Sequence, residues 1–221
     1  MAINWNEIDT VFLDMDGTLL DLYFDSYFWK THLPKRYAEK HDINEVQAND
    51  HIIPRLQQKE GTLEWYCLEH WSDIFQLDLV SLKQEVEHLI QYRPSAREFL
   101  ETLQRENKRL VLATNAHMDV IKLKFLHTDL EIFFDKIICS HDFGCAKENS
   151  GFWEAVNEVE PFDKQKTMFI DDNLSVLRQA KVYGIRHLYS IHKPDSKLPP
   201  KKTDEFLAIR DFRDLLPANW K

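Results

Sequence analysis

The chain has 221 residues, 43% of them hydrophobic, and a formal net charge of -9 with a pI of about 5.6. This composition is typical of a soluble globular protein with one large domain, or of a core with an inserted subdomain. The acidic balance argues against a nucleic acid polymer as partner, because such partners need basic patches, but it leaves room for a small phosphorylated substrate.

The sequence shows no sign of export or of a membrane span. The N-terminus lacks a basic stretch followed by an apolar one, and no apolar run reaches the roughly 18 residues that a span needs. The three cysteines, Cys67, Cys139 and Cys145, are odd in number and lack zinc-type spacing. We therefore expect free thiols and a cytoplasmic protein without membrane partners. The oligomeric state is not indicated.

Apolar runs typical of buried parallel strands alternate with helical patterns along most of the chain. The strands are expected at 10–13, 109–113, 136–139, 167–170 and around 185–191, and helices at 119–128, 150–159 and 173–183. Ser95 and Glu98 predict a capping box that starts another helix, and a closing helix is expected over 204–215. This alternation predicts an α/β fold with a doubly wound parallel sheet.

Residues 22–92 interrupt the alternation, because about 70 residues without a clear strand separate the first two strands. Their pattern predicts helices at roughly 24–40, 44–58, 62–75 and 80–91. A single crossover between parallel strands needs far fewer residues. The sequence therefore predicts an α/β core formed by residues 1–21 and 93–221, with an inserted all-helical cap subdomain at 22–92.

Polar residues of compatible chemistry follow four of the predicted strands, and the carboxyl ends of parallel strands are where such sheets bind ligands. They are Asp14 and Asp16 after the first strand, Thr114 and Asn115 after the second, Lys147 in the loop after the third, and Asp171 and Asp172 after the fourth. The carboxylates predict a Mg²⁺ site, and Thr114, Lys147 and a backbone amide at Gly17 suit a phosphate group. Each motif alone also fits a turn, a solvated lysine or a helix cap, but their occurrence together favours a site.

This series, in its order, strand context and spacing, resembles the phosphatases of the haloacid dehalogenase superfamily. The resemblance implies that Asp14 is a nucleophile forming an aspartyl-phosphate, and that Asp16 is the general acid and base. It implies that Asp14, the backbone carbonyl of Asp16, Asp171 and Asp172 form the Mg²⁺ site. Whether Asp171 or Asp172 is the direct ligand is left open. Thr114, Asn115 and Lys147 would bind the phosphoryl group. An acid at position 16 favours phosphate monoesters over organic halides, because an alkoxide needs a proton to leave.

Longer segments, "DTVFLDMDGTLLDLYFDSYFW", "TLEWYCLEHW", "ATNAH", "FGCAKE" and "FIDD", are similar to bacterial nucleotidases that act on GMP and IMP. This implies a purine 5′-monophosphate as substrate. Tyr66, Trp65 and His117 are candidate substrate-binding residues, because an aromatic side chain stacks well on a purine. The alternatives are aromatic residues that form the core of the cap, and a surface histidine. A sugar-phosphate phosphatase, a phosphomutase and a non-catalytic binding protein are alternative functions.

Overall fold

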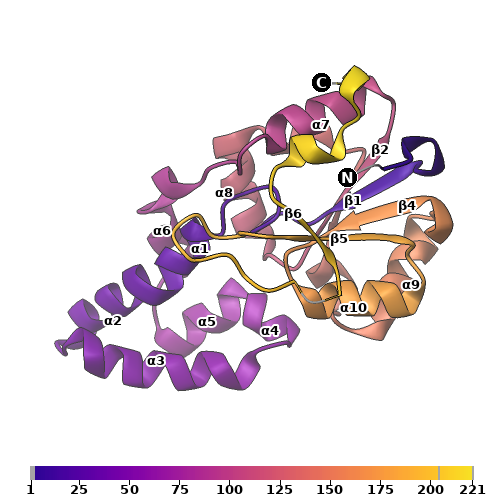
Figure 1. Ribbon diagram of the computed structural model, residues 1–221. Coiled ribbons are helices and arrows are strands. Elements are labelled where there is room, and N and C mark those ends of the chain that lie inside the picture. Colours follow the sequence, from indigo (N-terminus) through magenta and orange to yellow (C-terminus); the bar gives the residue numbers. More distant parts are fainter. Residues whose placement is uncertain (1–2, 204, 221) are drawn as a thin grey trace.

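The computed structural model describes residues 3–203 and 205–220, and within these residues six parallel strands form one sheet in the order β3-β2-β1-β4-β5-β6 (Figure 1). The strands are β1 (Thr10–Leu13), β2 (Arg109–Thr114), β3 (Lys136–Cys139), β4 (Thr167–Ile170), β5 (His187–Ile191) and β6 (Leu207–Ile209). β1 lies between β2 and β4, with Phe12 opposite Val111 on one side and Phe169 on the other. The predicted α/β fold with a parallel sheet is confirmed.

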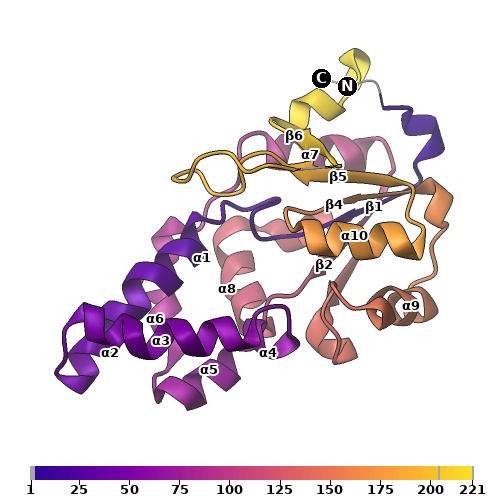
Figure 2. The same cartoon turned by 60° about the horizontal axis from the view of Figure 1, so that its bottom comes forward.

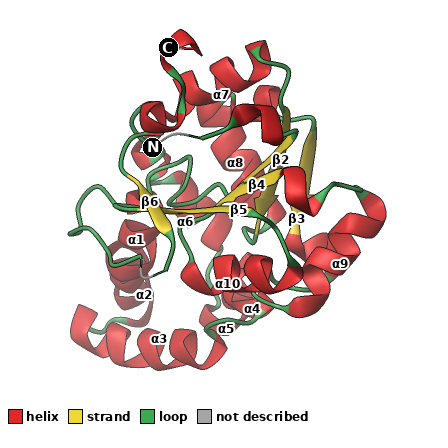
Figure 3. Cartoon of the chain, turned by 45° about the vertical axis from the view of Figure 1, so that its right-hand side comes forward, coloured by secondary structure: helices red, strands yellow, loops and turns green. Residues whose placement is uncertain are grey.

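Helices cover both faces of the sheet, which makes the fold doubly wound (Figure 3). The covering helices are α7 (Ala96–Arg105) and α8 (Met118–Thr128) on one face, and α9 (Ser150–Val159) and α10 (Leu174–Tyr183) on the other. Alternation along β1 explains the two cores, because Val11 and Leu13 pack with the first pair of helices, whereas Phe12 packs with the second. Apolar residues on both faces give the strands their continuous apolar sequences.

The chain between β1 and α7 is helical and forms a lobe beside the sheet (Figures 1 and 2). Its helices are α1 (Tyr23–Tyr27), α2 (Leu33–His41), α3 (Glu45–Lys59), α4 (Leu63–Tyr66), α5 (Leu68–Phe75) and α6 (Leu79–Gln84), with a π-helical turn, Phe28–His32, between α1 and α2. Trp71 and Phe75 are buried and stack with ring centroids 5.6 Å apart. The inserted helical cap is confirmed, while its exact boundaries at 22 and 92 stay a prediction.

Two local predictions are wrong. The stretch predicted as a closing helix over 204–215 contains β6 and a 3-10 helix, Phe212–Leu215, and residue 204 lies outside the described residues. β6 pairs with β5, so the backbone hydrogen bonds of the sheet edge override the helical spacing of the apolar residues. Ser95 makes no capping bond, because its backbone is left-handed (φ 61°) rather than extended as an N-cap residue normally is.

Short 3-10 helices complete the described chain, at Trp5–Glu7, Glu87–Leu89, Leu130–Phe133, Ser140–Phe143, Lys164–Lys166, Phe212–Leu215 and Ala218–Trp220. None of the described helices is both long enough and apolar enough to cross a membrane.

Candidate active site

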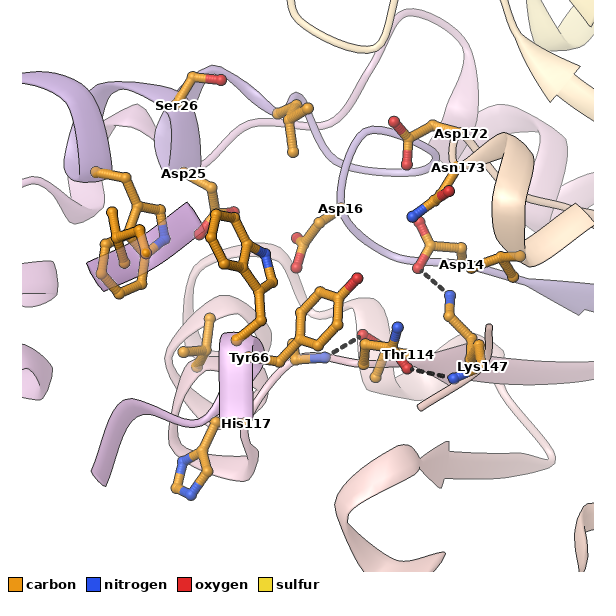
Figure 4. A pocket seen from close by; sticks show the side chains of 18 of the residues that line it. Asp14, Asp16, Asp25, Ser26, Tyr66, Thr114, His117, Lys147, Asp172 and Asn173 are labelled. Atoms are coloured by element: carbon orange, nitrogen blue, oxygen red, sulfur yellow. Dashed lines mark hydrogen bonds and ion pairs between the residues drawn. The ribbon is translucent and has the colours of Figure 1, made fainter. Parts of the chain in front are cut away.

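A cavity of about 800 Å³ lies where the carboxyl ends of the central strands meet the helical cap (Figure 4). The strand order β3-β2-β1-β4 makes these ends neighbours, so residues far apart in the sequence converge here. Every site residue predicted from the sequence borders the cavity: Asp14, Asp16, Trp65, Tyr66, Thr114, Asn115, His117, Lys147, Asp171 and Asp172.

Lys147 lies at the bottom of the cavity and connects two of the strand ends. Its Nζ atom donates to Asp14 Oδ1 and Asp171 Oδ2, both at 2.7 Å, and to the carbonyl of Ala113 at 2.9 Å. Burial lowers the pKa of Lys147, but the two carboxylates outweigh that effect and hold the pKa above its ordinary value. Lys147 therefore stays charged and offsets the repulsion between Asp14 and Asp171.

The carboxylates of Asp14, Asp171 and Asp172 offer oxygen atoms that all lie within 4.8 Å of one another. Burial raises the pKa of both Asp171 and Asp172, and repulsion from Asp14 adds to the increase. Buried carboxylates crowded in this way are stabilised by a hard divalent cation, and an all-oxygen donor set is the one that Mg²⁺ prefers. The residues present therefore fit a Mg²⁺ ion.

Gly17 allows the first strand end to approach this cluster closely. Its backbone is left-handed (φ 81°), and a Cβ atom there would lie 2.9 Å from Cγ of Asp172, closer than atoms pack. Only glycine meets both conditions without strain. Lys201, which the sequence pattern did not single out, reaches Asp172 from the loop after β5, with Nζ 3.1 Å from Oδ2.

Asp16 belongs to a chain of buried charges that connects the core with the cap. Its Oδ1 atom accepts a hydrogen bond from Lys124 of α8 at 2.5 Å, and Lys124 also donates to Asp25 of α1 at 2.7 Å. Asp25 in turn accepts from Lys83 of α6 at 2.6 Å. Burial raises the pKa of Asp16 to about 6, against the opposing effect of Lys124. A carboxyl group with such a pKa exchanges protons readily near neutral pH, as a general acid and base must.

Buried Lys124 and Lys83, and half-buried Asp25 between them, are charged residues that the sequence analysis missed. They lie on predicted helices, where a lone charged residue is usually solvated. Lys124 directly follows Leu123, and the other residues on that side of the helix are apolar. This pattern is a weak signal that Lys124 is buried.

Glu148 is a further missed residue, and it collects hydrogen bonds from three segments. It accepts from the hydroxyl of Tyr66 at 2.6 Å, from Asn115 Nδ2 at 2.8 Å and from Asn173 Nδ2 at 3.3 Å. The Asn115 side chain also accepts from the backbone amide of Lys147 at 2.9 Å. The amide of Asn115 therefore helps to position both Glu148 and Lys147.

Thr114 and the aromatic candidates occupy different depths of the cavity. Thr114 is buried, and its hydroxyl oxygen accepts from the backbone amide of Ala116 at 3.0 Å. Tyr66 and Trp65 of the cap border the cavity, whereas Trp71 is fully buried and packs within the cap. Burial, together with the Glu148 carboxylate, raises the pKa of Tyr66, so its hydroxyl stays a proton donor.

His117 borders the cavity through its position on the loop after β2, but its ring points away from Asp14 and Asp16 (Figure 4). Its Nδ1 atom lies 3.4 Å from the amide nitrogen of Asp119, at the start of α8. This imidazole therefore faces another part of the junction between cap and core.

Comparison with known proteins identifies the class of the molecule. A family model of haloacid dehalogenase-like hydrolases matches residues 8–182. Among solved structures, a haloacid dehalogenase phosphatase from Thermococcus onnurineus superimposes with a TM-score of 0.77 at 20% identity, over 94% of this chain and 95% of that one. The chain therefore belongs to the haloacid dehalogenase-like hydrolases, and the protein is an enzyme.

Two curated relatives narrow the comparison within that family. The chain is 36% identical over 216 residues to the GMP/IMP nucleotidase YrfG of Escherichia coli (strain K12), covering 98% of this chain and 97% of the relative. It is 25% identical over 191 residues to a phosphorylated carbohydrates phosphatase of Thermotoga maritima, covering 83% and 85%. Both relatives have names that denote enzymes acting on phosphorylated compounds.

Proposed function

We propose that the protein is a cytoplasmic, Mg²⁺-dependent phosphatase that hydrolyses purine 5′-monophosphates, GMP and IMP in particular, through an aspartyl-phosphate. The observation that carries this proposal is the pairing of Asp14 with Lys147 at 2.7 Å, beside Asp171 and Asp172, at the bottom of a cavity that the aromatic residues of the cap border. The free thiols of Cys67, Cys139 and Cys145 support the proposed cytoplasmic location, because the cytoplasm keeps thiols reduced.

In the first step, a carboxylate oxygen of Asp14 attacks phosphorus and forms a bond to it, while the bond from phosphorus to the ester oxygen breaks. Asp16 donates its proton to the departing oxygen, which leaves as the nucleoside hydroxyl. Lys147 neutralises negative charge on the phosphoryl oxygens, and Thr114 and Asn115 hold the group at the end of β2.

In the second step, a water molecule attacks the phosphorus of the aspartyl-phosphate. Asp16, now ionised, accepts a proton from this water, and the bond between phosphorus and the Asp14 oxygen breaks to release inorganic phosphate. A Mg²⁺ ion held by Asp14, Asp171, Asp172 and the backbone carbonyl of Asp16 would supply positive charge to the transferring group.

The preference for a purine rests on the nucleotidase relative and on the cap. Tyr66 and Trp65 present aromatic surface to the cavity, and stacking of a base on an aromatic side chain is worth about 1–3 kcal/mol. The phosphorylated carbohydrates phosphatase at 25% identity supports an alternative, in which the cavity accepts a sugar phosphate.

The test is a panel of phosphate monoesters assayed for release of inorganic phosphate in the presence of Mg²⁺. GMP, IMP, AMP, glucose 6-phosphate and p-nitrophenyl phosphate separate the alternatives, and kcat/KM is the quantity compared. We expect the highest values for GMP and IMP. A higher kcat/KM for the sugar phosphate would overturn the purine assignment, and conversion of a sugar phosphate to its isomer without phosphate release would indicate a mutase.

A further inference from the structure

A second group of metal-ligating side chains lies at the junction of cap and core, outside the carboxylate cluster. Cys67 and Glu69 of the cap and His117 of the core each offer a ligand atom, and these atoms all lie within 4.8 Å of one another. Cys67 directly precedes α5 and Glu69 lies in its first turn, whereas His117 precedes α8. Ligands from the cap and from the α/β core therefore converge.

The donor set differs in kind from that of the carboxylate cluster. A thiolate, an imidazole and a carboxylate suit Zn²⁺, whereas Mg²⁺ prefers oxygen alone. The start of α5 favours negatively charged ligands, because the amides of a first helical turn carry partial positive charge. Donors around a tetrahedral Zn²⁺ lie about 3.5 Å apart, so movements of about 1 Å bring these atoms to bonding geometry. Glu69 is exposed and its side chain is free to make such a movement.

A second imidazole, that of His141, lies edge-on to His117 with ring centroids 5.3 Å apart. Its Nε2 atom is buried and has no hydrogen-bond partner among residues 3–203 and 205–220, which is unusual for a buried polar atom. This unsatisfied nitrogen is an independent sign that the junction accommodates a further group.

We propose that Cys67, Glu69 and His117 bind a Zn²⁺ ion across the junction of cap and core, with His141, whose ring contacts that of His117, as a candidate fourth donor. Because the ligands come from both sides, the bound ion holds the cap against the core. The site is chemically distinct from the carboxylate cluster, and the proposal does not depend on the substrate of the enzyme.

Cobalt(II) tests the proposal, because it replaces Zn²⁺ and gives a near-ultraviolet charge-transfer absorption only when a thiolate is bound. The metal-free full-length protein is titrated with Co²⁺ in excess Mg²⁺, which occupies the carboxylate cluster. We expect the thiolate absorption to saturate at one equivalent of Co²⁺ and to vanish when Zn²⁺ is added. We also expect His117→Ala and Glu69→Gln to weaken the affinity by about tenfold or more.

Two cysteine variants identify which residue supplies the thiolate that binds the metal. Cys67→Ser should lose the thiolate absorption, whereas Cys145→Ser, which alters a half-buried thiol outside the group, should keep it. Circular dichroism establishes that each variant is folded. Absence of the absorption in the unaltered protein, or its persistence in Cys67→Ser, would overturn the proposal.

Discussion

Replacement of Lys124 by methionine tests whether the buried charge chain positions Asp16. The lysine side chain is 2% exposed and contacts both Asp16 and Asp25, so methionine keeps most of its volume and removes its charge. Loss of one partner from a buried ion pair costs about 3–5 kcal/mol. We expect the free energy of unfolding to fall by about 3 kcal/mol, the lower end of this range. The loss is small because Asp25 retains its ion pair with Lys83 and because Asp16 is able to take up a proton. For a protein of this size, that lowers Tm by roughly 6–12 °C.

The same substitution should change the pH dependence of catalysis. Lys124 opposes the increase in the pKa of Asp16, so its removal raises that pKa further above about 6. In the proposed first step Asp16 donates its proton, and therefore the alkaline limb of the kcat/KM profile should move to higher pH. A poorly oriented acid should also lower kcat/KM for GMP by about 10²-fold, the smaller end of what a general acid contributes.

The assay compares GMP with p-nitrophenyl phosphate, whose leaving group departs without much help from an acid. The loss in kcat/KM should be larger for GMP. Lys122→Met is the matched control, because Lys122 lies on the same helix, is 68% exposed and pairs with the exposed residue Asp119. Equal losses on both substrates, an unchanged pH profile, or the same effects in Lys122→Met would refute the reasoning.

Three further substitutions test the remaining roles. Asp14→Asn should abolish phosphate release while circular dichroism stays unchanged, because an amide is a poor nucleophile but nearly isosteric; activity within about tenfold of the unaltered enzyme would exclude Asp14 as nucleophile. Asp16→Asn should lower kcat by about 10²–10⁴ without changing Mg²⁺ affinity measured by calorimetry, and a collapse of Mg²⁺ binding would instead make its side chain a ligand. Tyr66→Leu should raise KM for GMP and leave hydrolysis of p-nitrophenyl phosphate nearly unchanged; equal losses on both would indicate that Tyr66 only supports the cap.

The sheet could be predicted from the sequence because its strands are buried on both faces. The run at 10–13 coincides with β1, and those at 136–139 and 167–170 coincide with β3 and β4. Parallel strands carry their polar residues just beyond the carboxyl end, so Asp14, Thr114 and the pair after β4 were found by position alone. The helix predicted over 204–215 was wrong because Phe206, Leu207 and Ile209 have a spacing that fits a short edge strand as well as a helix.

The residues that the sequence analysis missed depend on tertiary contacts. Lys124 and Asp25 are unremarkable charged residues on helices until the cap packs against α8 and brings them into contact. Glu148 follows Lys147 directly, but its bonds to Tyr66 and Asn173 come from other parts of the chain. Spacing along the sequence carries no information about such partners. Similarly, Cys67 and His117 are brought together only by the fold.

The position of β1 in the middle of the sheet has a consequence for how the protein is made. Thr10 of β1 lies opposite Arg109 of β2 on one side and Thr167 of β4 on the other, so the first strand synthesised waits for partners that emerge much later. The helices of the insertion rest on contacts between nearby residues, which form quickly, whereas parallel pairing of distant strands is slow. Asp14 and Asp171 then meet around Lys147, which is synthesised between them. A nascent chain that ends before β4 therefore carries the whole helical insertion but lacks Asp171 and Asp172, so its carboxylate cluster is incomplete.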